Sequence, residues 1–227
     1  KQIGGAPANV VFYLSRLDEN PVLVSRVGTD SLGEEALAVG QNCSLKTDFI
    51  QKDEVHCTGK VNVHLDSQGV PRFEILDNVA WDFIEESPPL FLAIKEADAV
   101  CFGTLAQRHE KSRTTIRRLL EQTRTDCLKV LDLNLRFPYF DKELIEASLR
   151  MADVLKLNSD ELAIVSELFS LNGVELELLR TLLEKFSIRK RPGTVSICAA
   201  ILNHYNVDPV PHIICGGFSK EETENAL

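Results

Sequence analysis

No apolar run in this sequence approaches the length of a membrane-spanning helix. The first residues, "KQIGG", have no apolar core region and do not form a signal peptide. Because no methionine leads them, we expect the numbering to begin inside a longer chain. The six cysteines form no Cys-x-x-Cys pair, and neither they nor the five histidines have metal-ligand spacing. Scattered cysteines of this kind favour a reducing, cytoplasmic location.

Positive charges are outnumbered by negative ones, with 25 Lys and Arg residues against 34 Asp and Glu residues. The formal net charge is -9, which argues against non-specific nucleic-acid binding because that binding needs a cationic surface. The single basic cluster, residues 189–191, stands alone and is typical of a solvated turn. A composition of 44% hydrophobic and 26% charged residues is typical of a globular domain and not of a disordered one. We therefore expect neither a nucleic acid nor a membrane as partner.

Three common ligand-binding motifs are absent. The sequence has no Gly-x-Gly-x-x-Gly after a strand, no Walker A loop and no Gly-x-Ser-x-Gly elbow. The late stretch "GGFSK" is too short for a phosphate loop and has no preceding strand. These absences exclude a typical dehydrogenase, P-loop ATPase or α/β-hydrolase.

Helical and strand patterns alternate along most of the chain. The apolar spacing predicts helices at 7–17, 32–42, 88–95, 111–123, 141–151 and from about 159, the second opened by a capping box of Ser31 and Glu34. Short apolar runs at 21–28, 98–103, 128–134 and 153–158 predict strands buried on both faces. This alternation predicts an α/β protein with a mostly parallel sheet, in which ligands bind beyond the carboxyl ends of the strands.

One segment interrupts this alternation. "KVNVHL" alternates apolar Val61, Val63 and Leu65 with polar residues, "DSQG" predicts a turn, and "PRFEIL" returns. The pattern predicts a β-hairpin that stands apart from the helical layers and can cover a ligand.

The stretch "DLNLR" places three polar side chains at or just past a strand end. Alternate residues of a strand share a face, so Asp132, Asn134 and Arg136 can converge there. A carboxylate, an amide and a guanidinium suit a phosphorylated or polyhydroxylated ligand. The alternative is an ion pair between Asp132 and a neighbour, with Asn134 in a turn.

Two further stretches each have a structural and a functional interpretation. In "NSDE", Asn158 and Glu161 have the spacing of a helix N-cap, and the same geometry can hold a hydrated Mg²⁺ near phosphates. In "GGAPANV", Gly4 and Gly5 suit a tight turn before a helix. They also let the backbone approach a polar ligand, while Asn9 can donate and accept hydrogen bonds, as a sugar hydroxyl requires.

In this order, the segments resemble the ribokinase-like, PfkB-type carbohydrate kinases, and within them the fructokinase-like members, over roughly residues 2–186. "GGAPANV" is similar to the family's sugar-binding motif, and "DLNLR" and "LKLNSDE" are similar to its Asp-x-Asn-x-Arg and Asn-x-x-Glu motifs. "SRVGTDSLGEEAL" resembles its Val-Gly-x-Asp-x-x-Gly segment, with Gly28, Asp30 and Gly33 in place.

The resemblance implies a three-layer α/β/α domain over residues 1–186, with a small β lid at about 57–76, that transfers the γ-phosphoryl group of ATP to a sugar hydroxyl. It implies sugar contacts from Gly4, Gly5, Asn9 and Asn134. Arg136 would face the transferred phosphoryl group. Asn158 and Glu161 would organise phosphate and Mg²⁺, Glu161 through water. The exposed lid could also mediate a homodimer.

The sequence departs from the family near residue 190. The family's Gly-Ala-Gly-Asp loop, which carries the catalytic base, does not occur. We expect a segment to be missing between about Lys190 and Ser196, so that residues 187–227 form a shortened or rearranged remnant. Because loss of a general base costs about two to four orders of magnitude in rate, we expect the chain to be weak or inactive.

Three readings therefore remain open. The first is a fructokinase-like sugar kinase in an incomplete or rearranged chain. The second is a non-catalytic sugar-binding or regulatory relative, and the third is a nucleoside kinase of the same superfamily. The order of "GGAPANV" and "RFEILDNVAWDFI" favours a hexose.

Overall fold

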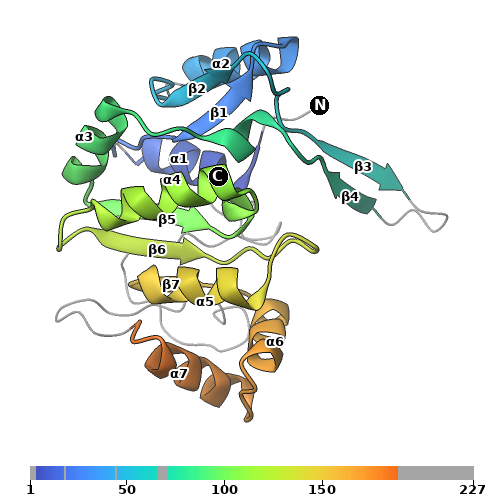
Figure 1. Ribbon diagram of the computed structural model, residues 1–227, viewed down its shortest axis with the longest axis vertical. Coiled ribbons are helices and arrows are strands. Elements are labelled where there is room, and N and C mark those ends of the chain that lie inside the picture. The colour runs from blue at the N-terminus through green and yellow to red at the C-terminus, as the bar shows by residue number, and fades with distance from the viewer. Residues whose placement is uncertain (1–3, 18, 44, 66–70, 189–227) are drawn as a thin grey trace. The chain divides into compact units, whose positions relative to one another are not determined.

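The computed structural model describes residues 4–17, 19–43, 45–65 and 71–188 (Figure 1). The chain divides into two compact units. Unit 1 comprises residues 1–97 and 106–125, and unit 2 comprises residues 98–105 and 126–227. The predicted C-terminal remnant lies outside the described residues from position 189 onward.

Unit 1 begins with α1 (Ala6–Ser15) and a β-α-β segment made of β1 (Ser25–Gly28), α2 (Ser31–Asn42) and β2 (Ile50–Asp53). The two strands are parallel, with Ser25 opposite Ile50 and Gly28 opposite Asp53. The predicted helices 7–17 and 32–42 are confirmed, and β1 occupies the end of the predicted strand 21–28. The sequence patterns gave no strand at 50–53, because "IQKD" has neither an apolar run nor an alternation.

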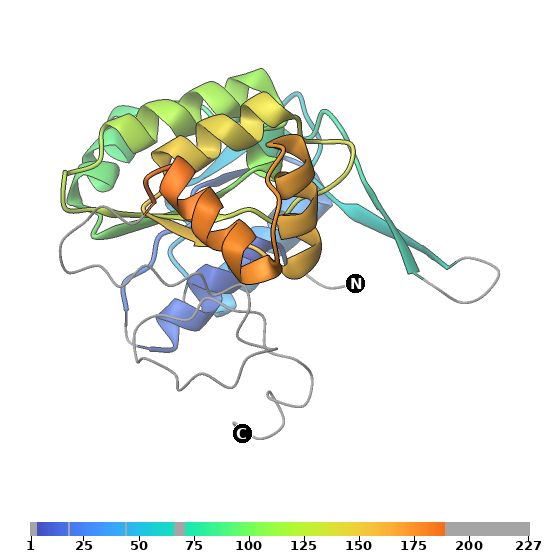
Figure 2. The same ribbon diagram turned by 90° about the horizontal axis from the view of Figure 1, so that it is seen from below.

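The predicted hairpin is confirmed as β3 (Val61–Leu65) paired with antiparallel β4 (Pro71–Ile75). Val61 lies opposite Ile75, and Leu65 lies opposite Pro71. In Figures 1 and 2 the hairpin projects from the rest of unit 1 in both views. The predicted turn at 66–69 lies outside the described residues.

The rest of unit 1 is helical. A short 3-10 helix, η1 (Ala80–Phe83), packs against β1 and against α4 (Glu110–Glu121), and α3 (Pro88–Glu96) packs on α4. These two α-helices confirm the predictions for 88–95 and 111–123. A second 3-10 turn, η2 (Leu105–Gln107), carries the chain from unit 2 back into unit 1.

Unit 2 contains a parallel sheet in the order β5 (Ala99–Gly103), β6 (Leu128–Asp132) and β7 (Val154–Lys156). Its helices are α5 (Lys142–Met151), α6 (Ser159–Leu168) and α7 (Glu175–Lys185). The three predicted strands and the helices at 141–151 and from 159 are confirmed. Helix α7 was not predicted from the sequence.

Polar N-caps open five of the helices. Each cap side chain accepts a hydrogen bond from the first turn, which satisfies a backbone N–H that has no partner inside the helix. The caps are Asp30 for α2, Ser87 for α3, His109 for α4, Asp141 for α5 and Asn158 for α6. The prediction that Ser31 and Glu34 cap α2 was wrong: Asp30, one residue earlier, accepts from the N–H of Gly33 at 2.9 Å.

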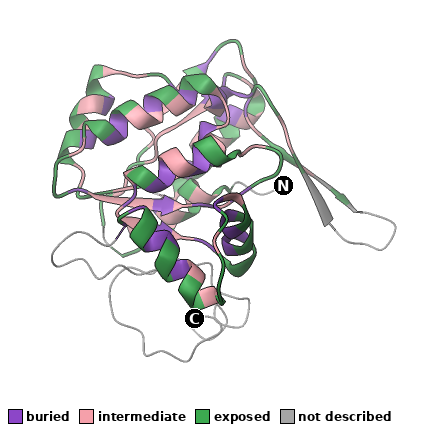
Figure 3. Ribbon diagram, turned by 60° about the horizontal axis from the view of Figure 1, so that its bottom comes forward, coloured by how far each residue is buried: buried purple, intermediate pink, exposed green. Residues whose placement is uncertain are grey.

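Each unit has its own apolar interior. Buried and exposed residues alternate along the helices, as amphipathic packing requires (Figure 3). In unit 2 the leucines of "LDLNL" are buried while the polar residues between them are half-buried. Asp132, at the end of β6, and Asn134, in the loop after it, therefore lie outside the core. Among the described residues, no helix is long and apolar enough to cross a membrane.

One buried carboxylate holds β1, β2 and η1 together in unit 1. Asp53, at the end of β2, is 2% exposed and lies 2.8 Å from the guanidinium of Arg26 on β1. Arg26 also donates to the carbonyl of Phe83 in η1 at 2.9 Å. Burial alone would raise the pKa of Asp53, but hydrogen bonds from the N–H groups of His56 and Val55, then the His56 imidazole and the Arg26 charge, outweigh it and lower that pKa to about 2.

Candidate functional site

The N-terminus of α1 is open where the sequence predicted a sugar site. Gly5, the N-cap, has φ 125° and ψ 143°, a conformation that L side chains rarely adopt. A Cβ on Gly4 or Gly5 would meet no atom within 4 Å. Gly5 is therefore required by its backbone conformation, whereas Gly4 is required by neither conformation nor packing. The open space leaves room for a ligand at this helix end.

Asn9 lies in the first turn of α1 with an exposed side chain. Its backbone N–H donates to the carbonyl of Gly5 at 3.0 Å, so the helix fixes its position. The side chain amide can offer both donors and an acceptor to a ligand. Gly4, Gly5 and Asn9 thus form one exposed group in unit 1.

The segment at 28–33 ties the beginning of α2 to the chain before the hairpin. Asp30 Oδ2 accepts from the N–H of Thr58 at 2.7 Å, and Oδ1 accepts from its hydroxyl at 2.7 Å. These bonds lower the pKa of Asp30, chiefly through the Thr58 N–H. The Thr58 hydroxyl in turn accepts from the N–H of Gly28 at 2.9 Å. This motif therefore has a structural role at the foot of the hairpin.

The two glycines of this motif are needed for close packing. A Cβ on Gly33 would overlap the carbonyl oxygen of Gly28, and one on Gly28 would lie 2.8 Å from the backbone of His56 and Thr58. Any larger residue would push α2 away from β1.

In unit 2, β6 ends at Asp132, and the following loop carries the other polar residues of "DLNLR". Lys156 Nζ on β7 lies 2.8 Å from Asp132 Oδ1, which is the ion pair that the alternative interpretation described. Asn134 has φ 42°, in the left-handed region that asparagine tolerates better than most residues. The alternation of a strand therefore does not extend to Asn134.

Arg136 is exposed in the loop after β6. Its Nη1 donates to the carbonyl of Leu135 at 2.9 Å, which uses one of its five N–H groups. The other donors leave a guanidinium that can bind an anion bidentately. Among the described residues, Arg136 makes no hydrogen bond or ion pair with Asp132 or Asn134.

Glu161 joins this loop to the beginning of α6. Asn158 Oδ1 accepts from the Glu161 N–H, and Glu161 Oε2 accepts from the Asn158 N–H, each at 2.9 Å. Glu161 Oε1 accepts from the N–H of Leu135 at 2.8 Å. The predicted capping box is confirmed, and its glutamate also fixes the backbone next to Arg136. Arg136 and Glu161 thus belong to one hydrogen-bonded loop-and-helix arrangement.

The hydrogen bonds of Glu161 limit the ways in which it could bind a metal ion. Glu161 is 7% exposed, and each of its oxygens already accepts a backbone N–H. Direct ligation would compete with those bonds, but a carboxylate has about four acceptor positions, so a water molecule could still donate to it. Within the described part of the chain, no group of three or more His, Cys, Asp or Glu residues could hold a metal ion. The residues fit a water-mediated role and not a direct ligand set.

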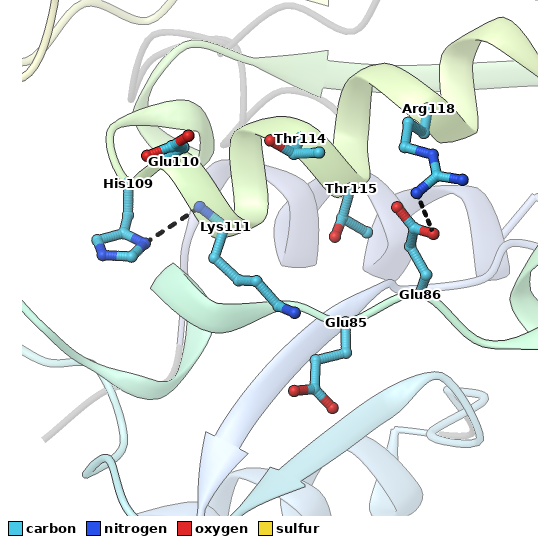
Figure 4. Close-up of a pocket in the computed structure, with 8 residues that line it drawn as sticks. All are labelled: Glu85, Glu86, His109, Glu110, Lys111, Thr114, Thr115 and Arg118. Carbon is cyan, nitrogen blue, oxygen red and sulfur yellow. Dashed lines mark hydrogen bonds and ion pairs between the residues drawn. The ribbon is translucent and has the colours of Figure 1, made fainter.

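A hollow of about 570 Å³ lies open to solvent in unit 1, between α4 and the segment before α3 (Figure 4). Glu85, Glu86 and Glu110 line it together with Lys111 and Arg118. Arg118 is ion-paired with Glu86 at 2.9 Å. None of the residues predicted to contact sugar or phosphate lines this hollow, and its charges are mixed, so it does not define a ligand site.

Sequence reasoning missed a buried ion pair near the hairpin. Arg108 and Asp82 are 26 positions apart, and their side chains are only 5% and 2% exposed. No local spacing rule connects residues so far apart. The only sequence signal was a charged residue at the end of an apolar stretch, "GTLAQR".

The fold and site together define a ribokinase-like protein: parallel strands alternate with helices, polar loops follow the strand ends, and a β-hairpin stands apart. The model of the pfkB family carbohydrate kinases matches residues 1–191. The chain therefore belongs to the pfkB family of carbohydrate kinases.

Individual relatives agree with this assignment. A sugar kinase of Pyrococcus horikoshii is 31% identical over 183 residues, which are 78% of this chain and 57% of the relative. A fructokinase of Salmonella typhimurium is 29% identical over 220 residues, which are 92% of this chain and 71% of the relative. The chain thus spans little more than half the length of the first of these relatives.

The fold is shared with solved kinase structures. The crystal structure of a Xylella fastidiosa fructokinase with bound ATP has a TM-score of 0.68 at 20% identity, covering 80% of this chain and 57% of that one. The three-layer α/β/α fold with a mostly parallel sheet, expected from the sequence, is therefore confirmed.

Proposed function

We propose that this protein acts on a fructose-like hexose as an ATP-dependent sugar kinase. The observation that carries the proposal is the family match over residues 1–191, within which the expected sugar and phosphate motifs occupy exposed helix and strand ends. The fructokinase relative from Salmonella typhimurium supports a hexose as the substrate class.

In this proposal each group of residues has a defined task. The open N-terminus of α1, with Gly4, Gly5 and Asn9, binds the sugar hydroxyls. Asn134 adds a polar contact from the loop after β6. Arg136 faces the phosphoryl group and stabilises the negative charge that spreads over its oxygens during transfer.

The nucleotide end of the proposed site rests on α6. Its N-terminus favours anions because the helix dipole and the unpaired N–H groups point there. Asn158 and Glu161 keep that end and the Arg136 loop in fixed positions. Mg²⁺, if bound with ATP, would neutralise phosphate charge, and Glu161 would hold it through water.

We also propose that this chain is catalytically weak. A base must accept the proton of the sugar hydroxyl, and the family's Gly-Ala-Gly-Asp sequence does not occur in the 227 residues. The same observation favours a second candidate, a sugar-binding relative without catalysis.

Two minor parts of the proposal concern location and assembly. Cys43 and Cys57 are free thiols, which suits the reducing cytoplasm.

The hairpin strands pair only with each other in the described residues, and Val61 is 50% exposed, so the hairpin offers a surface for a homodimer.

Sugar binding can be tested without catalysis. Saturating fructose at about 100 times Kd stabilises the folded state by about 2.7 kcal/mol, or roughly 5 to 10 °C for a chain of this size. We expect Asn9→Ala to abolish that shift. The matched control, Asn42→Ala, changes an exposed asparagine at the end of α2 and should keep it.

Turnover is then measured as ADP release from Mg²⁺–ATP with fructose and a small sugar panel. We expect turnover far below the 1–100 s⁻¹ typical of kinases. Ordinary turnover would contradict the proposed weakness. A panel without any melting shift, or an Asn9→Ala variant that binds as well as the wild type, would contradict the proposed sugar site.

A further inference from the structure

Arg108 and Asp82 form a buried ion pair in unit 1 that the proposed mechanism does not use. Arg108 Nε lies 2.7 Å from Asp82 Oδ1, and Nη2 lies 2.8 Å from Oδ2, so the pair is bidentate. The two side chains are 5% and 2% exposed. Burying two charges costs several kcal/mol of hydration free energy, and an apolar pair would often be at least as stable. The pair therefore calls for an explanation other than stability.

The same guanidinium holds the end of the hairpin. Arg108 Nη2 donates to the carbonyl of Leu76, the first residue after β4, at 2.5 Å. Its Nη1 lies 3.3 Å from Oδ1 of Asp77, the next residue. One buried side chain thus fixes the position at which β4 leaves the hairpin.

The segment before β3 also packs near Arg108, through the side chain of Trp81. The Arg108 guanidinium lies over the Trp81 ring, 4.0 Å from its centroid. A Cβ on Gly59, two residues before β3, would overlap the indole of Trp81, so Gly59 packs directly against this ring. The N–H of Ala80 also donates to the carbonyl of Cys57 at 2.8 Å. Both ends of the hairpin therefore meet the stacked pair of Arg108 and Trp81.

We propose that Arg108, held by Asp82 and stacked on Trp81, is a positioning residue that sets the direction of the β3–β4 hairpin and thereby its fit over bound sugar. The sugar part of this inference rests on the proposed function. The hairpin part rests on the geometry of unit 1 alone.

The length of the hairpin explains why its junction with the rest of unit 1 must be held in place. A hairpin of two strands is marginally stable alone, so its direction is set where it joins the fold. A strand of five residues is about 16 Å long, and a rotation of about 10° at its root would move its tip by about 3 Å. Misplacement by about 1 Å can cost a factor of about 100 when a group must meet a substrate.

The test substitutes Arg108→Lys, which keeps the charge but cannot make the bidentate pair and the Leu76 bond together. Its matched control is Arg118→Lys on α4, where the arginine is 59% exposed and pairs with Glu86, away from the hairpin. Asp82→Asn is the second variant, should Arg108→Lys fail to fold. Hydrogen exchange is followed along the whole chain, and fructose affinity is measured by titration well below the melting temperature.

We expect Arg108→Lys to accelerate exchange in the hairpin and its two ends while leaving α5 unchanged. We expect fructose to bind roughly tenfold more weakly, the loss of about one hydrogen bond between a misplaced hairpin and the sugar. Arg118→Lys should match the wild type in both measurements. Unchanged hairpin exchange, or uniform acceleration along the chain with unchanged fructose affinity, would overturn the inference.

The two proposals can fail separately. If the wild type binds no fructose, the proposed substrate is wrong, and the hairpin exchange alone decides whether Arg108 positions the hairpin. If the wild type binds fructose and Arg108→Lys binds it equally well, the proposed function stands and the positioning role is wrong.

Discussion

Glu161 offers the sharpest test of how the loop after β6 is held. Glu161→Gln preserves size and shape but replaces one carboxylate oxygen by an NH₂ group. In the structure both oxygens accept backbone N–H groups, from Leu135 and from Asn158. Whichever way the glutamine amide turns, its NH₂ group must face one of these two N–H donors, of which that of Leu135 is buried and that of Asn158 is partly buried.

The size of the effect follows from these contacts. An unsatisfied buried N–H costs about 1–3 kcal/mol. Loss of a negative charge in the first turn of a helix costs about 0.3–1 kcal/mol more. We therefore expect Glu161→Gln to lower the free energy of unfolding by about 1–4 kcal/mol. This cost should be present without Mg²⁺ and ATP, because both bonds are to the backbone.

Urea unfolding followed by far-ultraviolet circular dichroism measures this difference. The control is Glu167→Gln, an exposed glutamate on the same helix, which should change stability by less than about 0.5 kcal/mol. A Glu161→Gln variant as stable as its control would refute the argument from the two backbone bonds. A cost that appears only with Mg²⁺ and ATP would assign Glu161 to the metal and not to the cap.

Three further predictions concern unit 1. The pKa of Asp53 is lowered to about 2 in the folded state from an ordinary value of 3.8. The ionised side chain therefore stabilises the folded state above about pH 4, and this stabilisation is lost as pH falls to about 2. That shift of 1.8 units corresponds to at most about 2.4 kcal/mol. The stability gap between wild type and Asp53→Asn, measured by urea unfolding, should therefore shrink by up to about 2 kcal/mol from pH 5 to pH 2, and a constant gap would contradict this prediction. Gly33→Ala should lower the melting temperature by several degrees, since its Cβ overlaps the Gly28 carbonyl and overpacking costs about 1–3 kcal/mol; an unchanged melting temperature would show that α2 moves freely. Gly5→Ala should cost about 1–2 kcal/mol because of its positive φ, whereas Gly4→Ala should be neutral, and equal unfolding energies for the two would refute this contrast.

Local patterns predicted the elements whose signal lies within a few residues. The helices from 88, 111, 141 and 159 and the strands of unit 2 have regular apolar spacing and were predicted from it. The Asn158–Glu161 capping box was predicted because its two partners are three residues apart. By contrast, β2 is four residues long and mixed in polarity, and its pairing with β1 depends on residues 25 positions away, as in Ser25 and Ile50.

The errors and omissions near the candidate site also arise from contacts between residues far apart in the sequence. The cap of α2 was placed at Ser31, but Asp30 is also held by Thr58, which lies 28 positions further along the chain. A carboxylate fixed from outside the helix can act as the cap even where a serine offers the better local pattern. The contact of Glu161 with Leu135 spans 26 positions and could not be read from "NSDE".

These long-range bonds change what the motifs mean. Asn158 and Glu161 were expected to be either a cap or a phosphate and metal site. The structure shows that Glu161 completes the capping box of α6 and also holds the backbone of Leu135, next to Arg136. The Asp30 motif likewise caps α2 and binds the chain before the hairpin. In both places one carboxylate joins a helix end to a loop that the proposed function needs in a fixed position. A structural interpretation of such a motif therefore does not compete with a functional one, because the cap supplies the preorganisation that binding and phosphoryl transfer require.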